Sequence, residues 1–161
     1  MNTQDICSVC GMAAVSGVST VVHHKMYFHF CSEQCRETFI AHPNLYSAKV
    51  GEKRNEILKY RTMRLDDPLD NDIADLLISY LMELMGVKEV AVEGDEIRIC
   101  YDLMQVTEIQ IEKALVTVGL QLGGGWLNRL CRSWVHNSEE NELDNQSKTA
   151  KQCCNRPPPR T

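Results

Sequence analysis

Two stretches near the start of the chain, ICSVCGM at residues 6–12 and YFHFCSEQCRETF at residues 27–39, together contain four cysteines. They are Cys7, Cys10, Cys31 and Cys35, in the spacing C-x2-C-x20-C-x3-C. Two close pairs separated by a stretch of about this length can bring four thiolates onto one tetrahedral metal ion. The alternative is that the cysteines are unliganded and pack as small hydrophobic side chains. We favour the metal site, because random cysteines do not fall into paired spacings.

Local signals around these cysteines predict a knuckle, a hairpin and a helix. Gly11 can take the positive φ that turns a backbone around a metal ion. Residues 18–22 and 25–30 are expected to form a short hairpin, and Ser32 is a good N-cap for a helix that ends before Pro43. Cys35 would then lie in the first helical turn, where the helix dipole lowers the pKa of a thiol. Knuckle, hairpin and helix make a treble clef, and a segment this short needs a structural metal to fold.

Composition and charge restrict the classes of function. The chain has 161 residues, eight cysteines and a formal net charge of −5, and the negative charge argues against a nucleic-acid partner. The first residues lack the basic and apolar regions of an export signal, and no apolar run is long enough for a transmembrane helix, so we expect a cytoplasmic protein. In that compartment the cysteines indicate metal or thiol chemistry rather than disulfides. Because no catalytic constellation emerges, we do not expect an enzyme.

Residues 1–47 resemble the TRASH/YHS family of small treble-clef metal-binding domains. The matching residues are Cys7, Cys10-Gly11-Met12, Tyr27-Phe28, Cys31-Ser32, Cys35, Phe39, Pro43 and Tyr46. Many YHS members have one cysteine before the Gly-Met, whereas this chain has a pair, as TRASH-type sites do. The resemblance implies heavy-metal sensing, trafficking or transport rather than catalysis, with zinc as the expected ion and copper(I) as the alternative.

Other side chains in this module are weaker ligand candidates. His23, His24 and His29 could replace a cysteine at the metal, but a histidine pair on a hairpin is more often solvated. Met12 could offer a thioether to copper(I), which prefers soft ligands. We favour the interpretation that Met12 is a core residue beneath the knuckle.

Residues 58–122 follow a basic connector, residues 48–57, which we interpret as a solvated face. The pattern predicts strand, helix, strand, strand, helix and strand, the βαββαβ order of a ferredoxin-like domain. The helix expected at 72–85 has an apolar face that includes Ile73 and Leu76. Gly86 is expected to end this helix. Thr107 and Gln110 form a capping box for the second helix. The remaining strands are expected at 58–65, 87–92, 96–101 and 120–122.

The same segment resembles the heavy-metal-associated domain of copper chaperones and metal-pumping ATPases. The resemblance rests on residues 86–90, 97–101 and 115–120. In that family a Cys-x-x-Cys pair opens the first helix, but the corresponding positions here are Asp70 and Ile73, which are not soft ligands. We therefore expect a domain that keeps the fold without the family's metal site.

Acidic residues gather near this loop. A hard cation is one interpretation, but acidic side chains at a helix N-terminus are better explained by the helix dipole. The residues concerned are Asp66, Asp67, Asp70 and Asp72.

The C-terminal part begins with three glycines and predicts an amphipathic helix at residues 123–136. The polar residues 137–161 are expected to form a disordered tail that contains Cys153 and Cys154. The fold class is therefore α+β: a zinc-finger-like treble clef, a ferredoxin-like domain, an amphipathic helix and a tail.

Together these features predict a heavy-metal protein that binds zinc or copper. It would act as a chaperone, sensor or accessory subunit of a metal-transporting P-type ATPase or another membrane-associated partner, because the two modules together resemble the N-terminal regions of such pumps. One alternative is a zinc-stabilised adaptor that docks a partner without transferring metal. A less favoured alternative is a thiol redox protein that uses Cys153 with Cys154, or Cys7 with Cys10.

Overall fold

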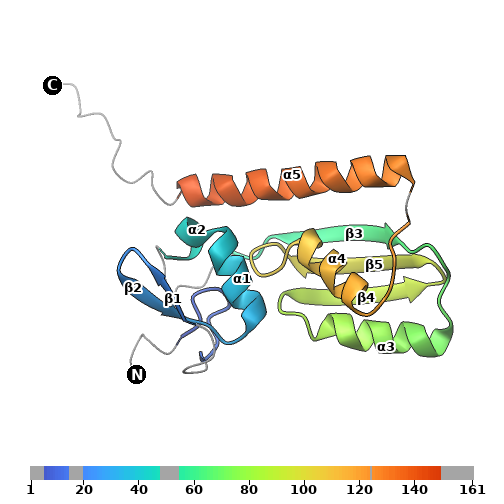
Figure 1. Ribbon diagram of the computed structural model, residues 1–161, viewed down its shortest axis with the longest axis horizontal. Coiled ribbons are helices and arrows are strands. Elements are labelled where there is room, and N and C mark those ends of the chain that lie inside the picture. Colours follow the sequence, from blue (N-terminus) through green and yellow to red (C-terminus); the bar gives the residue numbers. More distant parts are fainter. Residues whose placement is uncertain (1–5, 15–19, 48–54, 124, 150–161) are drawn as a thin grey trace. The chain divides into compact units, whose positions relative to one another are not determined.

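The computed structural model describes residues 6–14, 20–47, 55–123 and 125–149, which form a mixed α/β protein (Figure 1). Within these residues there are two small antiparallel sheets and five helices. The chain divides into two compact units, residues 1–52 with 140–161 and residues 53–139.

The first unit contains a hairpin and two short helices. Strands β1 (Thr20–His23) and β2 (Met26–His29) are antiparallel partners, as predicted. The turn between them places His24 and Lys25 at positive φ, 50° and 66°, the backbone combination of a tight hairpin turn. Helix α1 (Glu33–Ala41) begins after Ser32, as predicted, and is followed by α2 (Pro43–Ser47), which was not predicted. Pro43 occupies the first position of α2, where the absence of an N–H is tolerated.

Aromatic side chains form the core of this unit. Phe30, Phe39 and Tyr46 are fully buried. The Phe39 ring lies 5.1 Å from that of Phe30 and 4.7 Å from that of Phe28, measured between centroids. This cluster packs the hairpin against α1, one turn beyond the cysteine in the first turn of that helix.

The second unit is a three-stranded sheet with helices. Its elements are β3 (Leu58–Arg64), α3 (Asn71–Met82), β4 (Val87–Glu93), β5 (Glu96–Asp102) and α4 (Glu108–Thr117). The strand order is β3-β5-β4, and both pairs are antiparallel. The strand predicted at 120–122 is reduced to a single bridge between Leu65 and Leu122, on the outer side of β3. Gly119 at φ 85° closes α4 just before this segment, so few residues remain for a longer strand.

Helix α3 corrects one expectation about its apolar face. Its buried residues are Ala74, Leu77 and Leu81, whereas Ile73 and Leu76 are 48% and 71% exposed. The helix contacts the edge strand β4, so only a narrow stripe of its surface meets the sheet. The sequence periodicity alone suggested a broader apolar face.

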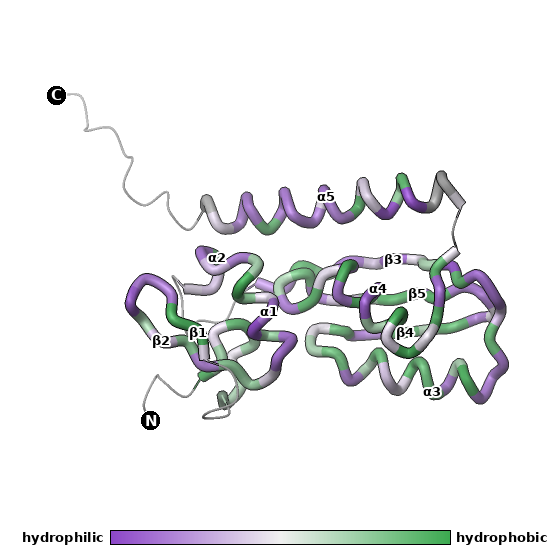
Figure 2. The backbone as a smooth tube through the Cα atoms, viewed as in Figure 1, coloured by the Kyte–Doolittle hydropathy of each residue, from purple (hydrophilic) through white to green (hydrophobic). Residues whose placement is uncertain are grey.

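The C-terminal helix corrects a second expectation. Helix α5 runs from Trp126 to Thr149, so the predicted helix end at residue 136 is wrong. The disorder predicted from residue 137 is likewise wrong for residues 137–149, which are helical. Hydrophilic residues dominate α5 (Figure 2), but Glu139 and Leu143 are 2% and 1% exposed. These two buried side chains anchor a stretch whose composition resembles a disordered tail. Residues 150–161, with Cys153 and Cys154, lie outside the described residues.

Across the described ranges, no helix combines the length and the apolar character that a membrane span requires.

Candidate metal centre

A tight backbone turn positions the first cysteine pair. The Gly11 N–H donates to the carbonyl of Cys7 at 2.9 Å, and the Cys7 N–H donates to the carbonyl of Met12 at 2.8 Å. Gly11 has φ 79°, as the sequence predicted, and an added Cβ there would meet nothing within 4 Å. The glycine is therefore required by the backbone conformation, not by crowding. This turn brings Cys7 and Cys10 to one side of the loop.

The second pair lies where β2 gives way to α1. Cys31 follows the strand after one residue, and Cys35 lies in the first turn of the helix. The N–H of Cys35 donates to the Ser32 side-chain oxygen at 3.3 Å, which is the N-cap bond that the sequence predicted. The cap fixes the start of α1 and with it the direction of the Cys35 side chain.

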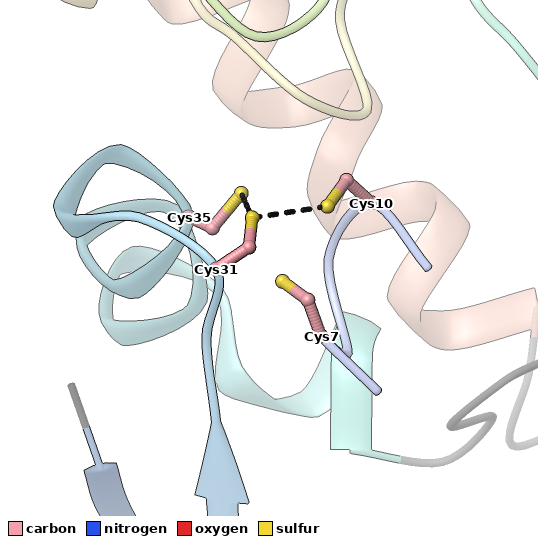
Figure 3. Close-up of side chains that lie close together, drawn as sticks. All are labelled: Cys7, Cys10, Cys31 and Cys35. Atoms are coloured by element: carbon pink, nitrogen blue, oxygen red, sulfur yellow. Dashed lines mark hydrogen bonds between the residues drawn. The ribbon is translucent and has the colours of Figure 1, made fainter. Parts of the chain in front are cut away.

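The structure brings the four predicted cysteines together, and Figure 3 shows their sulfur atoms turned toward a common centre. All four sulfurs lie within 4.8 Å of one another, and none is in a disulfide. The Cys10 and Cys31 sulfurs are 3.3 Å apart, and those of Cys31 and Cys35 are 3.7 Å apart. Four sulfurs about 2.3 Å from a tetrahedral zinc would be about 3.8 Å apart. The cluster therefore has nearly the dimensions of a tetrathiolate site.

The burial of the four cysteines is uneven. Cys7 and Cys35 are 1% and 0% exposed, whereas Cys10 and Cys31 are partly exposed. Cys7 and Cys35 are thus enclosed by protein, whereas Cys10 and Cys31 are partly open to solvent.

The electrostatics of the cluster favour one thiolate and oppose further ones. Hydrogen bonds from Cys10 and then Cys35 lower the pKa of Cys7 well below its ordinary value. For Cys10, the hydrogen bond with Cys35 lowers the pKa, but the bond with Cys7 and burial outweigh it and raise the pKa to about 12. Hydrogen bonds with Cys10 and Cys7, and burial, raise the pKa of Cys35. Four thiolates can coexist here only around a cation, because a bound ion offsets the repulsion between their negative charges.

The alternative ligands named from the sequence do not join this cluster. The His23 ring packs edge-on against Phe39, with centroids 6.0 Å apart, and His29 Nδ1 is 3.1 Å from the Thr20 hydroxyl. Met12 is 55% exposed, so its prediction as a core methionine is wrong. Its backbone carbonyl closes the knuckle, while its side chain lies largely in solvent.

The positions that resemble a lost metal site lie at the start of α3. Asp70 is the N-cap of that helix, and Ile73 is exposed in its first turn. The four nearby aspartates do not form a group of converging ligand atoms among the described residues. Of the other described cysteines, Cys100 is buried in β5 and Cys131 is exposed on α5.

A second group of potential ligands was missed by the sequence analysis. It consists of Glu108, Glu112 and His136, whose ligand atoms all lie within 4.8 Å of one another. The only local signal is the i, i+4 spacing of the two glutamates on α4, which is common on solvated helices. The histidine comes from α5, and no sequence pattern indicates that pairing.

Comparisons of the chain with protein-family models, curated proteins and solved structures found no match. The class of site therefore rests on geometry: four cysteines lie close together and could hold a metal ion.

Proposed function

We propose that the chain is a heavy-metal protein whose cluster of Cys7, Cys10, Cys31 and Cys35 holds zinc, with copper(I) as the alternative ion. The observation that carries this proposal is the convergence of four unbridged sulfurs at nearly tetrahedral spacing. Thiolates are soft ligands that suit both ions, and four-cysteine tetrahedral sites are typical of structural zinc. Knuckle, hairpin and capped helix support the interpretation of residues 1–47 as a TRASH/YHS-like treble clef.

The uneven burial of the cluster favours metal exchange. The ligands of a purely structural zinc can all be buried. Here Cys10 and Cys31 are partly exposed, which leaves a route for incoming ligands. Thiol-to-thiol transfer needs such a route, because the receiving ligand must reach the ion before the donor releases it. This favours a chaperone or sensor over an adaptor that only needs a folded module.

We further propose that residues 58–122 are a heavy-metal-associated, ferredoxin-like domain that has lost its ligands. The proposal is supported by the strand order β3-β5-β4 with a bridge on the outer side of β3, because the first and third strands of that fold are central. Asp70 and Ile73 at the start of α3 supply no soft ligand. Such a domain would dock a partner from the cytoplasm. We propose that this partner is a metal-transporting P-type ATPase.

The first experiment is native mass spectrometry of the full chain purified from its own host. We expect at least one tightly held ion in the wild-type protein, and one ion fewer in Cys31→Ser and in Cys35→Ser. The matched control is Cys131→Ser, because Cys131 is exposed on α5 and should not contribute. Full metal content in both cluster variants would show that the ion binds elsewhere.

A second experiment distinguishes exchange from a structural role. A competing chelator should remove the ion within minutes, faster than the first unit unfolds, so that loss of the metal precedes loss of structure. In the adaptor alternative, release would occur only at the rate at which that unit unfolds. A redox function instead requires a reversible disulfide near cytosolic potentials, and thiols that oxidise only under harsh conditions would exclude it.

A further inference from the structure

The second unit contains a cluster of potential metal ligands formed by two helices. Glu108 is the first residue of α4, Glu112 lies one turn later, and His136 comes from α5. The three ligand atoms all lie within 4.8 Å of one another. His136 Nε2 is 3.5 Å from Glu112 Oε1, close to the edge of about 3.4 Å expected for a tetrahedron with metal–ligand bonds of about 2.1 Å.

Three polar atoms of this cluster lack hydrogen-bond partners among the described residues. Glu108 is 4% exposed, and its Oε2 atom is buried without a hydrogen bond. The same holds for Glu112 Oε1 and His136 Nε2. Buried polar groups are nearly always satisfied, and a buried carboxylate is costly unless a cation or hydrogen bonds compensate it. Three such atoms facing one another point to a missing ligand.

Neighbouring arginines compensate the cluster only in part. Arg61 Nε lies 3.5 Å from Glu108 Oε2, and Arg132 Nε lies 3.6 Å from Glu112 Oε1, both without hydrogen-bond geometry. Glu139 also faces the cluster, with its Oε1 atom 3.9 Å from Arg61 Nη2. Three carboxylates therefore meet two guanidinium groups. Burial, and then the charge of Glu139, raise the pKa of Glu108 to about 7, which is a further sign of uncompensated negative charge.

We propose that Glu108, Glu112 and His136 bind a divalent first-row transition-metal ion of the zinc type. Two carboxylates and one imidazole form a borderline-hard ligand set that suits zinc and disfavours copper(I), which prefers sulfur. Because the ligand atoms lie within 4.8 Å of one another, contraction by at most about 1.4 Å would bring them to tetrahedral spacing. A pocket of about 230 Å³ reaches one of the three ligands, since its lining includes Glu108 together with Arg61 and Arg132. The ion would fasten the first half of α5 to α4.

This site is independent of the four-cysteine cluster. It uses other elements and another ligand chemistry, so the chain would hold one soft and one borderline-hard site. Either site can fail in experiment without affecting the other.

The test counts zinc ions bound to the full chain in a Cys153→Ser/Cys154→Ser background, which removes the two cysteines of the C-terminal segment. We expect two equivalents by native mass spectrometry, and one equivalent in Glu112→Gln and in His136→Gln. These two residues are partly exposed, so the variants should fold, which far-UV circular dichroism and thermal melting verify. The matched control is Glu140→Gln, an exposed glutamate on α5 that should leave two equivalents.

Cobalt(II) provides a readout that does not depend on any variant. The first equivalent should show the intense sulfur-to-cobalt charge transfer of a thiolate site. The second should add only weak d–d absorption, and it should persist in Cys31→Ser, where the first is lost. A single zinc equivalent in the folded background protein, or sulfur charge transfer from the second cobalt equivalent, would overturn the proposal.

Discussion

At the residue scale, protons and a metal ion compete for the same sulfur atoms of the four-cysteine cluster. The pKa of Cys10 is raised to about 12 and that of Cys35 is also raised, while that of Cys7 is lowered. In the metal-free protein the raised pKa values favour the protonated thiols of Cys10 and Cys35 at neutral pH. Metal binding must release these protons, so proton concentration enters directly into the apparent affinity.

The first prediction concerns this pH dependence. Lowering the pH favours the protonated sulfurs and should release the ion, whereas raising the pH should strengthen binding. The apparent zinc affinity should increase more than tenfold per pH unit near neutrality if more than one proton leaves with each ion bound. Competition with a chromophoric chelator, corrected for the chelator's own protonation, measures this slope. An affinity that does not change between pH 6 and pH 8 would contradict thiolate ligation.

The second prediction concerns Gly86, which has φ 92°. A Cβ there would lie 2.7 Å from the Cβ of Gln105 and 3.3 Å from the carbonyl oxygen of Asp102. Gly86→Ala should lower the free energy of unfolding of the second unit by about 2–4 kcal/mol, from backbone strain and overpacking together. The control is Gly94→Ala, where φ is 62° but no atom lies within 4 Å, so about 1 kcal/mol is expected. Urea denaturation measures both, and equal losses would show that crowding at Gly86 is unimportant.

At the element scale, α5 depends on a buried carboxylate. Glu139 accepts hydrogen bonds from the Tyr101 hydroxyl and, at 3.0 Å, from the Glu108 N–H at the start of α4. One side chain thus joins the central strand, the N-terminus of α4 and the C-terminal helix. The negative charge also lies where the dipole of α4 favours it.

The third prediction tests this connection. Glu139→Ala should destabilise the second unit by about 2–4 kcal/mol, because it leaves two buried donors without an acceptor. Glu139→Gln should lose less, since an amide oxygen can still accept one of the bonds. The control Glu140→Ala alters an exposed neighbour and should stay within about 0.5 kcal/mol of the wild type. Denaturant unfolding followed by tryptophan fluorescence measures the series, and a wild-type stability for Glu139→Ala would refute the role of the carboxylate.

The fourth prediction uses the start of α3. Asp70→Cys with Ile73→Cys should create a second soft-metal site, because the two positions flank the first turn of the helix and Ile73 is exposed. Native mass spectrometry should find one additional copper(I) ion. A folded double variant without that ion would contradict the proposed correspondence with the heavy-metal-associated family.

At the scale of the whole molecule, the two units differ in what stabilises them. The first has a small aromatic core next to the cysteine cluster, whereas the second buries apolar residues between a three-stranded sheet and its helices. Small modules bury too little apolar surface to fold without a metal or disulfide.

The fifth prediction follows from this difference. Removal of the ion with a strong chelator should unfold the hairpin and α1 while β3, β4 and β5 keep their hydrogen bonds. Amide hydrogen exchange with mass-spectrometric detection should therefore show loss of protection at residues 20–47 and retention at 58–102. Simultaneous loss in both segments would mean that the two units fold as one.

The sequence by itself determined the features that depend on near neighbours in the chain. The paired cysteines, the positive φ at Gly11 and the Ser32 cap were predicted correctly, because each acts over a few residues, whereas α3 ends at Met82 and not at the predicted Gly86. Only the tertiary structure decided that α3 buries Ala74 rather than Ile73, because that choice depends on the position of β4. Only the tertiary structure showed that α5 continues beyond residue 136, because Glu139 and Leu143 are buried although the sequence around them is polar. It also brought His136 to Glu108 and Glu112, a meeting of two helices that no spacing along the chain encodes.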